Sequence, residues 1–268
     1  MNKRIGILIF LVMAGFSLMV GQVPETAGIR VTILYDNYAA AEEVQADWGF
    51  SCLVQGAEKT ILFDAGTRAA ILRENVRNLK VDLSRVDLIV LSHLHGDHAG
   101  GLEWVLSQKR DIPVYLPAMA GEEYMAKVRQ WGGRPVPVSK SLEICSKVFS
   151  TEEMPADFDP AFSEQSLVLQ TGKGLLVITG CAHPGILAVV RHAPQVASGM
   201  PRVVLGGFHL LNKKDGEIHA IIREMKVAGV ERCGASHCTG DRASELFREA
   251  FADRFLKLGV GRVLTFDW

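Results

Sequence analysis

The stretch that decides the fold is Val86-Asp-Leu-Ile-Val-Leu-Ser-His93-Leu-His95-Gly96-Asp97-His98-Ala-Gly-Gly101. An apolar segment of strand length leads directly into three imidazoles and one carboxylate. Side chains two positions apart in an extended chain point the same way, so His93 and His95 can bind one ion together. Gly96 then lets the chain turn, and Asp97 and His98 can face a second ion. Nitrogen and carboxylate ligands of this kind suit zinc, manganese or iron.

The pattern H-x-H-x-D-H is specific. With eight histidines in 268 residues, chance would produce it in roughly three of ten thousand such chains. A single closed zinc site is the main structural alternative, since four ligands complete a tetrahedron. Two side chains per ion would instead leave each ion in need of further ligands from elsewhere in the chain.

Three later histidines can supply those ligands. His183, His209 and His237 each follow a strand-like segment and stand next to glycine or small residues. Loops at strand ends are where an α/β domain commonly assembles its site. The pattern therefore favours His183 and His237 as metal ligands and leaves His209 open between a site residue and an ordinary polar residue. His192 and His219 fall in helix-like segments and are interpreted as ordinary surface or structural histidines.

Composition excludes several classes of protein. The chain is 48% hydrophobic and 22% charged, as folded globular domains are, and unlike disordered or disulfide-framework proteins. Lys+Arg 29 against Asp+Glu 30 gives a formal net charge of -1, so no general positive field attracts nucleic acid. No phosphate-binding glycine loop or dinucleotide fingerprint occurs, so no nucleotide cofactor is implied. We expect a small-molecule substrate of anionic character as the partner.

The five cysteines, Cys52, Cys145, Cys181, Cys233 and Cys238, form no C-x-x-C pair. Their odd number would leave at least one thiol unpaired in an exported protein. We interpret them as small buried apolar residues. Cys181 and Cys238 differ from the others only in lying close to a histidine considered above.

Residues 1–28 differ from the rest of the chain. Lys3 and Arg4 precede an uncharged run over residues 5–20, which has the form of a secretory signal peptide or, if it is not removed, of an N-terminal anchor. We therefore expect an exported protein, periplasmic or extracellular, that touches a membrane only through residues 5–20. A buried N-terminal helix is the alternative.

Residues 29–268 are expected to form one layered α/β domain with mixed sheets, because strands come first and helices alternate with strands only later. The segment 133–165 is rich in proline and charge and is either a lid over the site or a surface connection. Gly172-Lys-Gly174 is interpreted as a hairpin turn. The expected strands are Val31–Tyr35, Ser51–Val54, Thr60–Phe63, Leu88–Leu91, Val114–Leu116, Ser166–Leu169, Leu175–Thr179, Arg202–Leu205 and Arg262–Phe266, and the expected helices are 68–79, 101–109, 120–131, 185–197, 216–228 and 241–257.

Taken together, the motifs resemble the metallo-β-lactamase-fold superfamily, whose signature stands here as His93-Leu-His95-Gly-Asp97-His98. Further motifs are similar to those of the subgroup named after 7,8-dihydropterin-6-methyl-4-(β-D-ribofuranosyl)aminobenzene-5′-phosphate synthase. These motifs are Leu34-Tyr-Asp-Asn, Trp48-Gly-Phe-Ser, Leu62-Phe-Asp64-Ala-Gly, Gly180-Cys-Ala-His183-Pro-Gly-Ile, Gly206-Gly-Phe-His209-Leu and His237-Cys-Thr-Gly. The resemblance implies an αββα sandwich of two mixed β-sheets flanked by helices, with a two-metal site at one edge.

The resemblance also implies roles for residues. The first ion is bound by His93 and His95, the second by Asp97 and His98, and both sets are completed by the ligands His183 and His237. Asp64 is expected to orient a ligand imidazole from behind. Many relatives place a bridging aspartate in a Gly-Asp turn, whereas this chain has Gly180-Cys181-Ala182-His183 there. Either His183 occupies that position or a water or hydroxide bridges the ions alone.

These residues predict a metal-dependent hydrolase with a binuclear centre, zinc being the expected metal and manganese or iron the alternatives. Such a centre would activate water against a phosphoester, ester or lactone. Asp97 would orient that water, and His209 would donate to an anionic group or leaving oxygen. The alternatives are a dihydropterin-type synthase, a transferase that releases pyrophosphate, and a metal-dependent ligand-binding protein without turnover.

Overall fold

The computed structural model describes residues 28–267. The signal peptide or anchor expected for residues 1–28 lies, except for Gly28, outside the described residues. Among the helices of the described part, none combines the length and the hydrophobicity that a membrane span requires. The described residues thus correspond to the domain that was expected to begin near residue 29.

The first sheet contains seven strands within residues 28–267. The strands β15, β1, β2 and β3 pair antiparallel, whereas β3, β4, β5 and β6 pair parallel, so the sheet is mixed. In spatial order they are β15 (Val263–Phe266), β1 (Ile29–Tyr35), β2 (Ser51–Gln55), β3 (Ile61–Phe63), β4 (Leu88–Val90), β5 (Pro113–Pro117) and β6 (Arg134–Val138).

The second sheet contains six strands of the same described part and is also mixed. Its strands β14, β13 and β12 run parallel, and β12, β11, β8 and β7 pair antiparallel. In spatial order they are β14 (Arg232–Ser236), β13 (Pro201–Gly207), β12 (Gly174–Thr179), β11 (Leu167–Thr171), β8 (Val148–Ser150) and β7 (Leu142–Cys145). A short separate ladder joins β9 (Met154–Pro155) to β10 (Ser163–Glu164).

The two sheets pack face to face over one apolar core. Val31, Phe63 and Val90 of the first sheet and Leu169 and Ile178 of the second belong to the same buried cluster. The alternation of inward and outward side chains along each strand places these residues on the facing surfaces. Burying them removes apolar area from water, which is the main term that stabilises such a sandwich.

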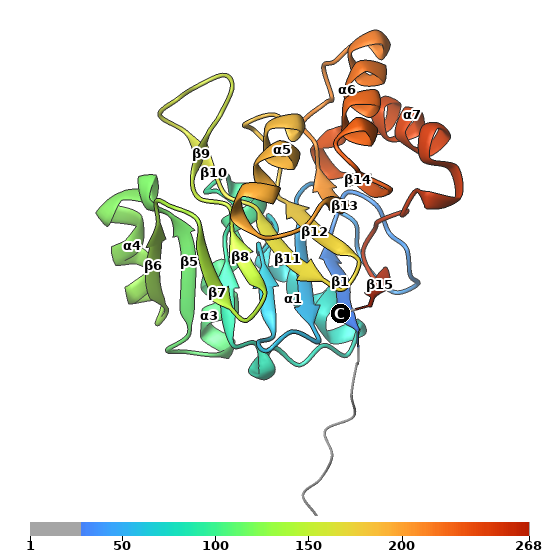
Figure 1. Ribbon diagram of the computed structural model, residues 1–268. Helices are drawn as coiled ribbons and strands as arrows, with labels where there is room; N and C mark the ends of the chain where they lie inside the picture. Colours follow the sequence, from blue (N-terminus) through green and yellow to red (C-terminus); the bar gives the residue numbers. More distant parts are fainter. Residues whose placement is uncertain (1–27, 268) are drawn as a thin grey trace, which may run out of the picture.

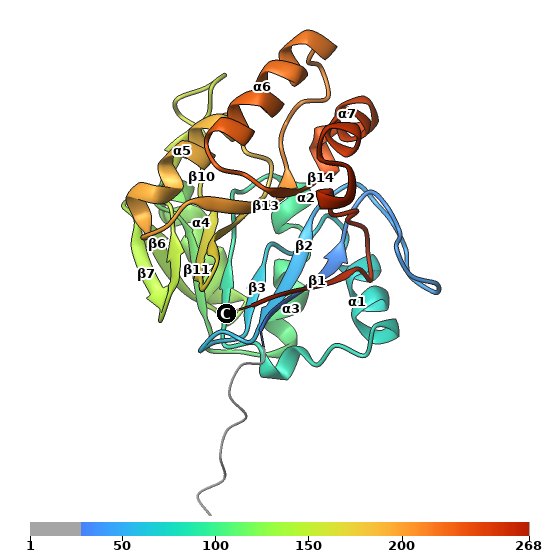
Figure 2. The ribbon, with the colours of Figure 1, turned by 45° about the vertical axis from the view of Figure 1, so that its right-hand side comes forward.

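Helices cover both outer faces. Figure 2 shows α5, α6 and α7 above the strands and α1 and α3 below them, and Figure 1 shows the same layers from another side. Two further apolar clusters join each group of helices to its own sheet. The expected αββα sandwich is thereby confirmed. The helices are α1 (Ala69–Asn78), α2 (Gly96–Ala99), α3 (Leu102–Gln108), α4 (Gly121–Gln130), α5 (Ile186–Val196), α6 (Asp215–Val227) and α7 (Asp241–Phe251), with 3-10 turns at Leu83–Arg85, Ala118–Ala120, His237–Thr239 and Ala252–Arg254.

All the strands and helices expected from the sequence are present, with ends that differ by a few residues. The helix expected over 241–257 is shorter, since α7 ends at Phe251 and Ala252 has a φ of 50°. The strands β6, β7, β8, β9, β10 and β14 were not expected. The sequence of β6, Arg-Pro-Val-Pro-Val, contains two prolines, which a strand tolerates at the edge of a sheet, where β6 lies.

The segment 133–165 divides into two parts. Residues 134–150 form β6, β7 and β8 and are therefore not a loop. Residues 151–165 contain β9 and β10 and project at one edge of the sandwich (Figure 1). Within them, Phe158 contacts the ring of His183 and Phe162 that of His95. The lid interpretation applies only to this second part.

Candidate metal centre

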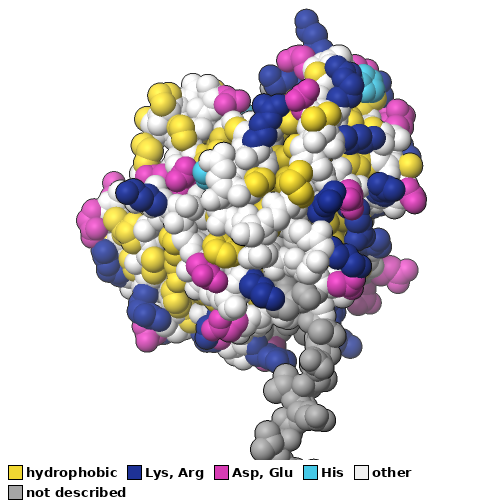
Figure 3. Space-filling view, in the orientation of Figure 1, with side chains coloured by type: hydrophobic (Ala, Val, Ile, Leu, Met, Phe, Trp, Pro, Cys, Tyr) yellow, Lys and Arg dark blue, Asp and Glu magenta, His cyan; other side chains and the backbone are white. Residues whose placement is uncertain are grey.

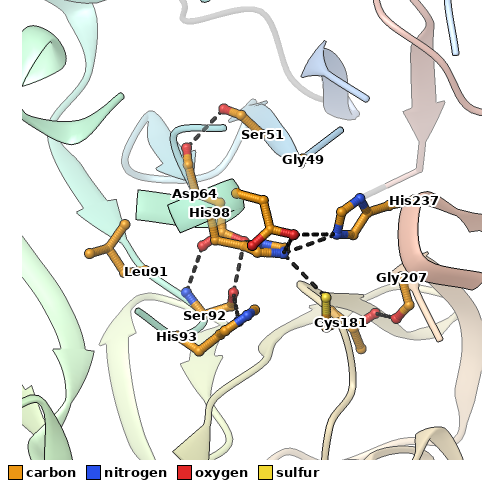
Figure 4. A network of polar contacts seen from close by, with 12 residues as sticks. Gly49, Ser51, Asp64, Leu91, Ser92, His93, His98, Cys181, Gly207 and His237 are labelled. Atoms are coloured by element: carbon orange, nitrogen blue, oxygen red, sulfur yellow. Dashed lines mark hydrogen bonds and ion pairs between the residues drawn. The ribbon is translucent and has the colours of Figure 1, made fainter. Parts of the chain in front are cut away.

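Asp64 is hydrogen-bonded to two residues of the first histidine cluster, Ser92 and His98. It directly follows β3 and is completely buried. Its Oδ1 accepts the Ser92 N–H at 2.7 Å, and its Oδ2 accepts the Ser92 hydroxyl at 2.8 Å and Nδ1 of His98 at 2.7 Å (Figure 4). Because the Nδ1 proton of His98 is donated to Asp64, Nε2 has a free lone pair. This contact agrees with the orienting role that was expected of Asp64.

His93 is buried, and its ring is held by the same serine. The Ser92 hydroxyl donates its hydrogen bond to Asp64, so its oxygen accepts the Nδ1–H of His93, with Nδ1 and Oγ 2.9 Å apart. Nε2 of His93 then has no partner, and it is the only buried side-chain nitrogen or oxygen without one in residues 28–267. Burial and the neighbouring imidazoles hold the pKa of His93 well below its usual range. A neutral, buried, unpartnered nitrogen is what a metal ion would satisfy.

His183 is oriented by a buried glutamate that was not expected from the sequence. Glu164 on β10 accepts Nδ1 of His183 at 2.8 Å and its backbone N–H at 2.9 Å. The backbone N–H groups of Cys181 and Ala182 donate to the same carboxylate at 2.8 and 2.9 Å. Burial would raise the pKa of Glu164, but these donors lower it to about 2. The carboxylate thus leaves Nε2 of His183 as the ring nitrogen available to a ligand.

His237 begins the turn after β14, and Asn37 holds it. Nδ1 of His237 donates to Oδ1 of Asn37 at 3.0 Å, and Nδ2 of Asn37 donates to the His237 carbonyl at 3.2 Å. Nε2 of His237 then lies 3.1 Å from Nε2 of His98. Burial would lower the pKa of His98, but the Asp64 carboxylate raises it to about 9. The site therefore favours a positive charge here, either a proton or a metal cation.

Asp97 completes this second group of ligands. Its Oδ2 lies 3.4 Å from Nε2 of His237 and 3.8 Å from Nε2 of His98. Burial would raise the pKa of Asp97, but the two imidazoles lower it below the usual range. Trp48 donates its indole N–H to the same oxygen at 2.8 Å. Asp97 therefore offers an anionic oxygen as a candidate ligand beside two imidazole nitrogens.

The six predicted ligands come together in neighbouring groups. In each group the candidate ligand atoms lie within 4.8 Å of one another: His93, His95 and Asp97; His93, His183 and Cys181; and Asp97, His98, His237 and Cys181. A fourth group contains Cys181, His209 and Cys238 and none of the six predicted ligands. These clusters of imidazole, carboxylate and thiol groups are compatible with the binding of divalent metal ions. Cys181 was interpreted only as a small buried residue, which is incomplete, because its Sγ lies in three of these groups. The departure from Gly-Asp at position 181 was the signal that could have identified it.

His95 and the lid segment form one wall of the site. The His95 ring is exposed and stacks on Phe162 with the ring centroids 4.4 Å apart. Phe158, which is 60% exposed, contacts His183 with the ring centroids 5.5 Å apart. The rings of Trp48 and His237 have their centroids 5.0 Å apart. Aromatic side chains therefore flank the metal ligands.

His209 shares a candidate group with Cys181 and Cys238 and with none of the six predicted ligands. It follows β13, has a φ of 52°, and its ring centroid is 4.5 Å from that of His183. With Phe158 and Lys213 it lines a cavity of about 490 Å³ that reaches His183. Contact with Cys238 raises the pKa of His209. A partly exposed imidazole in this position can contact a ligand bound in the cavity.

The remaining histidines, the cysteines and the surface charges were also subjects of prediction. His192 and His219 belong to no candidate metal group, as interpreted from their helical positions. All five cysteines are free, and four of them are buried, while Cys145 is partly buried. The face in Figure 3 has basic and acidic side chains intermixed. The expectation that nucleic acid is not a partner stays a prediction.

Comparison with known families gives a match that includes the first histidine cluster and His183 but ends before His209 and His237. The model of the family described as "Metallo-beta-lactamase superfamily" matches residues 49–194. A 7,8-dihydropterin-6-methyl-4-(beta-D-ribofuranosyl)-aminobenzene-5'-phosphate synthase of Methanocaldococcus jannaschii is 26% identical over 92% of this chain and 100% of its own. An uncharacterized protein of the same organism is 28% identical over 87% of this chain and 99% of its own.

Among solved structures, one titled as a metal-dependent hydrolase of the beta-lactamase superfamily, Tm1679, superposes with a TM-score of 0.76. It is 27% identical and covers 89% of this chain and 99% of its own. A diphosphatase of the PhnP family superposes with a TM-score of 0.59 at 13% identity, which indicates the fold alone. The chain is thus similar over nearly its whole length both to a protein named as a synthase and to one named as a hydrolase.

Proposed function

We propose that this chain, which belongs to the metallo-beta-lactamase superfamily, is an enzyme that uses two divalent metal ions, zinc in the first place, to hydrolyse a small anionic substrate. The substrate class is a phosphoester, ester or lactone. The observation that supports this proposal is the common orientation of four imidazoles. Each has its Nδ1 bound to a partner, which leaves Nε2 free: His93 to Ser92, His98 to Asp64, His183 to Glu164 and His237 to Asn37.

Two divalent ions bound by these residues would polarise the substrate and make a water molecule acidic enough to attack near neutral pH. The chain supplies the positioning. Asp97, next to His98 and His237, can accept a proton or a hydrogen bond from the attacking water. His209 lies where it can donate to an anionic group or to a leaving oxygen. Phe158 would exclude water from one side of the cavity.

The first test measures turnover of bis-p-nitrophenyl phosphate and of a simple lactone, with and without chelator. Chelator should abolish turnover and added zinc should restore it. His95→Ala should lose both turnover and metal content, because His95 belongs to the first ligand group. His219→Ala, at an exposed helical position, is the matched control and should retain both. Turnover by the metal-free protein would overturn the proposal.

A transferase activity is the second candidate, and it is favoured by the similarity to the dihydropterin-type synthase. In that reaction the chain would hold a pyrophosphate leaving group at the ligand groups while an aromatic carbon of the second substrate attacks the carbon that carries it. The carbon–oxygen bond to pyrophosphate breaks as the new bond forms, and the attacking ring loses a proton. Detection of a condensation product together with pyrophosphate would select it over hydrolysis. Stoichiometric ligand binding with neither hydrolysis nor condensation would instead favour a metal-dependent binding protein.

Export of the chain is a separate proposal, supported only by the basic and apolar pattern of residues 1–28. Fractionation of cells that express the full chain, with N-terminal sequencing of the product, tests it. A shortened chain outside the cytoplasm would indicate a cleaved signal, and a full-length membrane fraction would indicate an anchor. A full-length soluble cytoplasmic product would contradict export.

A further inference from the structure

We infer that Cys181 is a metal ligand shared by the two ions, with its thiolate in the position between them. The inference rests on the proposed binuclear centre and identifies its bridging protein ligand. None of the six ligands predicted from the sequence is a cysteine. The observation behind it is that Cys181 Sγ lies within 4.8 Å of candidate ligand atoms in the two groups that hold His93 with His183 and His98 with His237, besides its group with His209 and Cys238.

The contacts of Cys181 agree with a position between the groups. Its Sγ lies 3.2 Å from Nε2 of His98, the ring nitrogen that Asp64 leaves free (Figure 4). The same sulfur belongs to a group with His93 and His183 on the other side. A thiol hydrogen bond to His98 would explain the first contact but not the second. A ligand shared by two ions explains both.

The backbone around Cys181 is fixed, so the sulfur has little freedom to move away. Glu164 accepts the backbone N–H groups of Cys181, Ala182 and His183. At Gly180, a Cβ atom would lie 2.1 Å from the Ser92 hydroxyl oxygen, so the chain can approach the first sheet this closely only with glycine there. The loop after β12 is thus held against the serine that also orients His93. The sulfur is positioned by the same contacts as the imidazoles.

Cys238 is the nearest alternative thiol, and its position does not suit the role. Its Sγ belongs to one candidate metal group, with Cys181 and His209, and that group contains no other histidine. It contacts the Cys181 carbonyl at 3.5 Å instead. A Cβ atom at Gly207 would lie 2.7 Å from this sulfur, so Cys238 is packed against the end of β13. Cys238 therefore contacts Cys181 and is not grouped with the six predicted ligands.

A thiolate in this position has chemical consequences. It adds a second negative charge to that of Asp97, which leaves the centre with two ions still net positive and attractive to an anionic substrate. Thiolate is a soft ligand that favours zinc and related ions over magnesium or manganese. The inference therefore predicts that the site selects zinc, cobalt or iron. A carboxylate at the same position would bind such ions without the sulfur's optical signature.

The test is cobalt titration of the full, metal-free chain, with bound ions counted by mass spectrometry and absorption measured in the near ultraviolet. Two cobalt ions per chain with a thiolate-to-cobalt charge-transfer band are expected. Cys181→Ser should lose the band and bind the second ion at least about tenfold more weakly. Cys181→Asp should lose the band yet still bind two ions, because a carboxylate can bridge.

Cys238→Ser and the remote Cys145→Ser are matched controls and should keep the band. Two bound cobalt ions without a band, or a band that survives in Cys181→Ser, would overturn this inference while leaving the binuclear centre intact. A band that disappears in Cys238→Ser alone would assign the ligand to Cys238 and also overturn it. Failure of the unsubstituted chain to bind cobalt or zinc would instead contradict the proposed function.

Discussion

The Nε2 atoms of His98 and His237 lie 3.1 Å apart, although Nδ1 of each ring is already bound to another side chain. Two neutral rings in this arrangement direct lone pairs at each other, which is unfavourable unless a proton or a metal cation lies between them. A proton can satisfy this pair, because Asp64 raises the pKa of His98 to about 9. Nε2 of His93, by contrast, has no partner within residues 28–267 and would be satisfied by a bound metal ion.

Zinc should therefore stabilise the chain strongly. A ligand at one hundred times its dissociation constant adds about 2.7 kcal/mol to the free energy of unfolding. For a domain of this size each kcal/mol raises Tm by about 2–4 °C. Thermal unfolding with chelator and then with excess zinc should show a rise of several degrees. His93→Ala should show a much smaller rise, and an equal rise in that variant would be evidence against the site.

Asp64→Asn should weaken metal binding without removing a ligand. The amide cannot accept from His98 and Ser92 as the carboxylate does, so the His98 ring loses its fixed tautomer. A loss of zinc affinity of about 10–100-fold is expected, measured by competition with a chromophoric chelator. Asp82→Asn, on the exposed turn at Leu83–Arg85, is the control. An affinity that is unchanged in Asp64→Asn would contradict the orienting role.

The fold was largely predictable from local patterns, and the site only in part. Apolar runs such as that of β4 identify a strand because burial on both faces demands them. The strand β14, Arg-Cys-Gly-Ala-Ser, has no such run and is held in place by its neighbour β13. Its partner is distant in sequence, so a local pattern contains no sign of it.

The residues that orient the ligands show the same limit. Asn37 and His237 are 200 positions apart, and only the closed sandwich brings them together. Glu164 looks like an ordinary charged residue in the sequence, yet it is buried against His183. The H-x-H-x-D-H motif was identified because its spacing is local. Cys181 gave a local signal, the replacement of Gly-Asp by Gly-Cys, but its proximity to two groups of histidines follows only from the meeting of the two sheets at one edge.

Glu164→Gln should reveal the buried carboxylate through pH. The pKa of Glu164 falls from 4.5 to about 2 in the folded chain. A lowered pKa means that its contribution to stability is present above about 4.5 and is lost as the pH falls through about 2. In metal-free protein at neutral pH the variant should be less stable by about 3 kcal/mol. Urea unfolding should show this difference shrinking as the pH falls, and a constant difference would contradict the assignment.

His209→Gln should separate catalysis from metal binding. The imidazole lies at the cavity beside His183 and outside the histidine groups that contain the predicted ligands. Metal content should therefore stay unchanged while kcat falls by about 100-fold, as for the loss of a general acid. His219→Gln is the matched control on α6. Loss of metal in His209→Gln would make His209 a ligand and not a donor to the substrate.

The most direct test of the central claim is the number of metal ions that each folded chain holds. The full chain is stripped with chelator, dialysed against zinc and then against metal-free buffer, and its metal content is measured by mass spectrometry against the protein concentration. The account predicts two zinc ions per chain, falling to one or fewer when His98 is changed to Ala. One ion or none in the unsubstituted chain, with no further ion taken up when zinc is in excess, would contradict it.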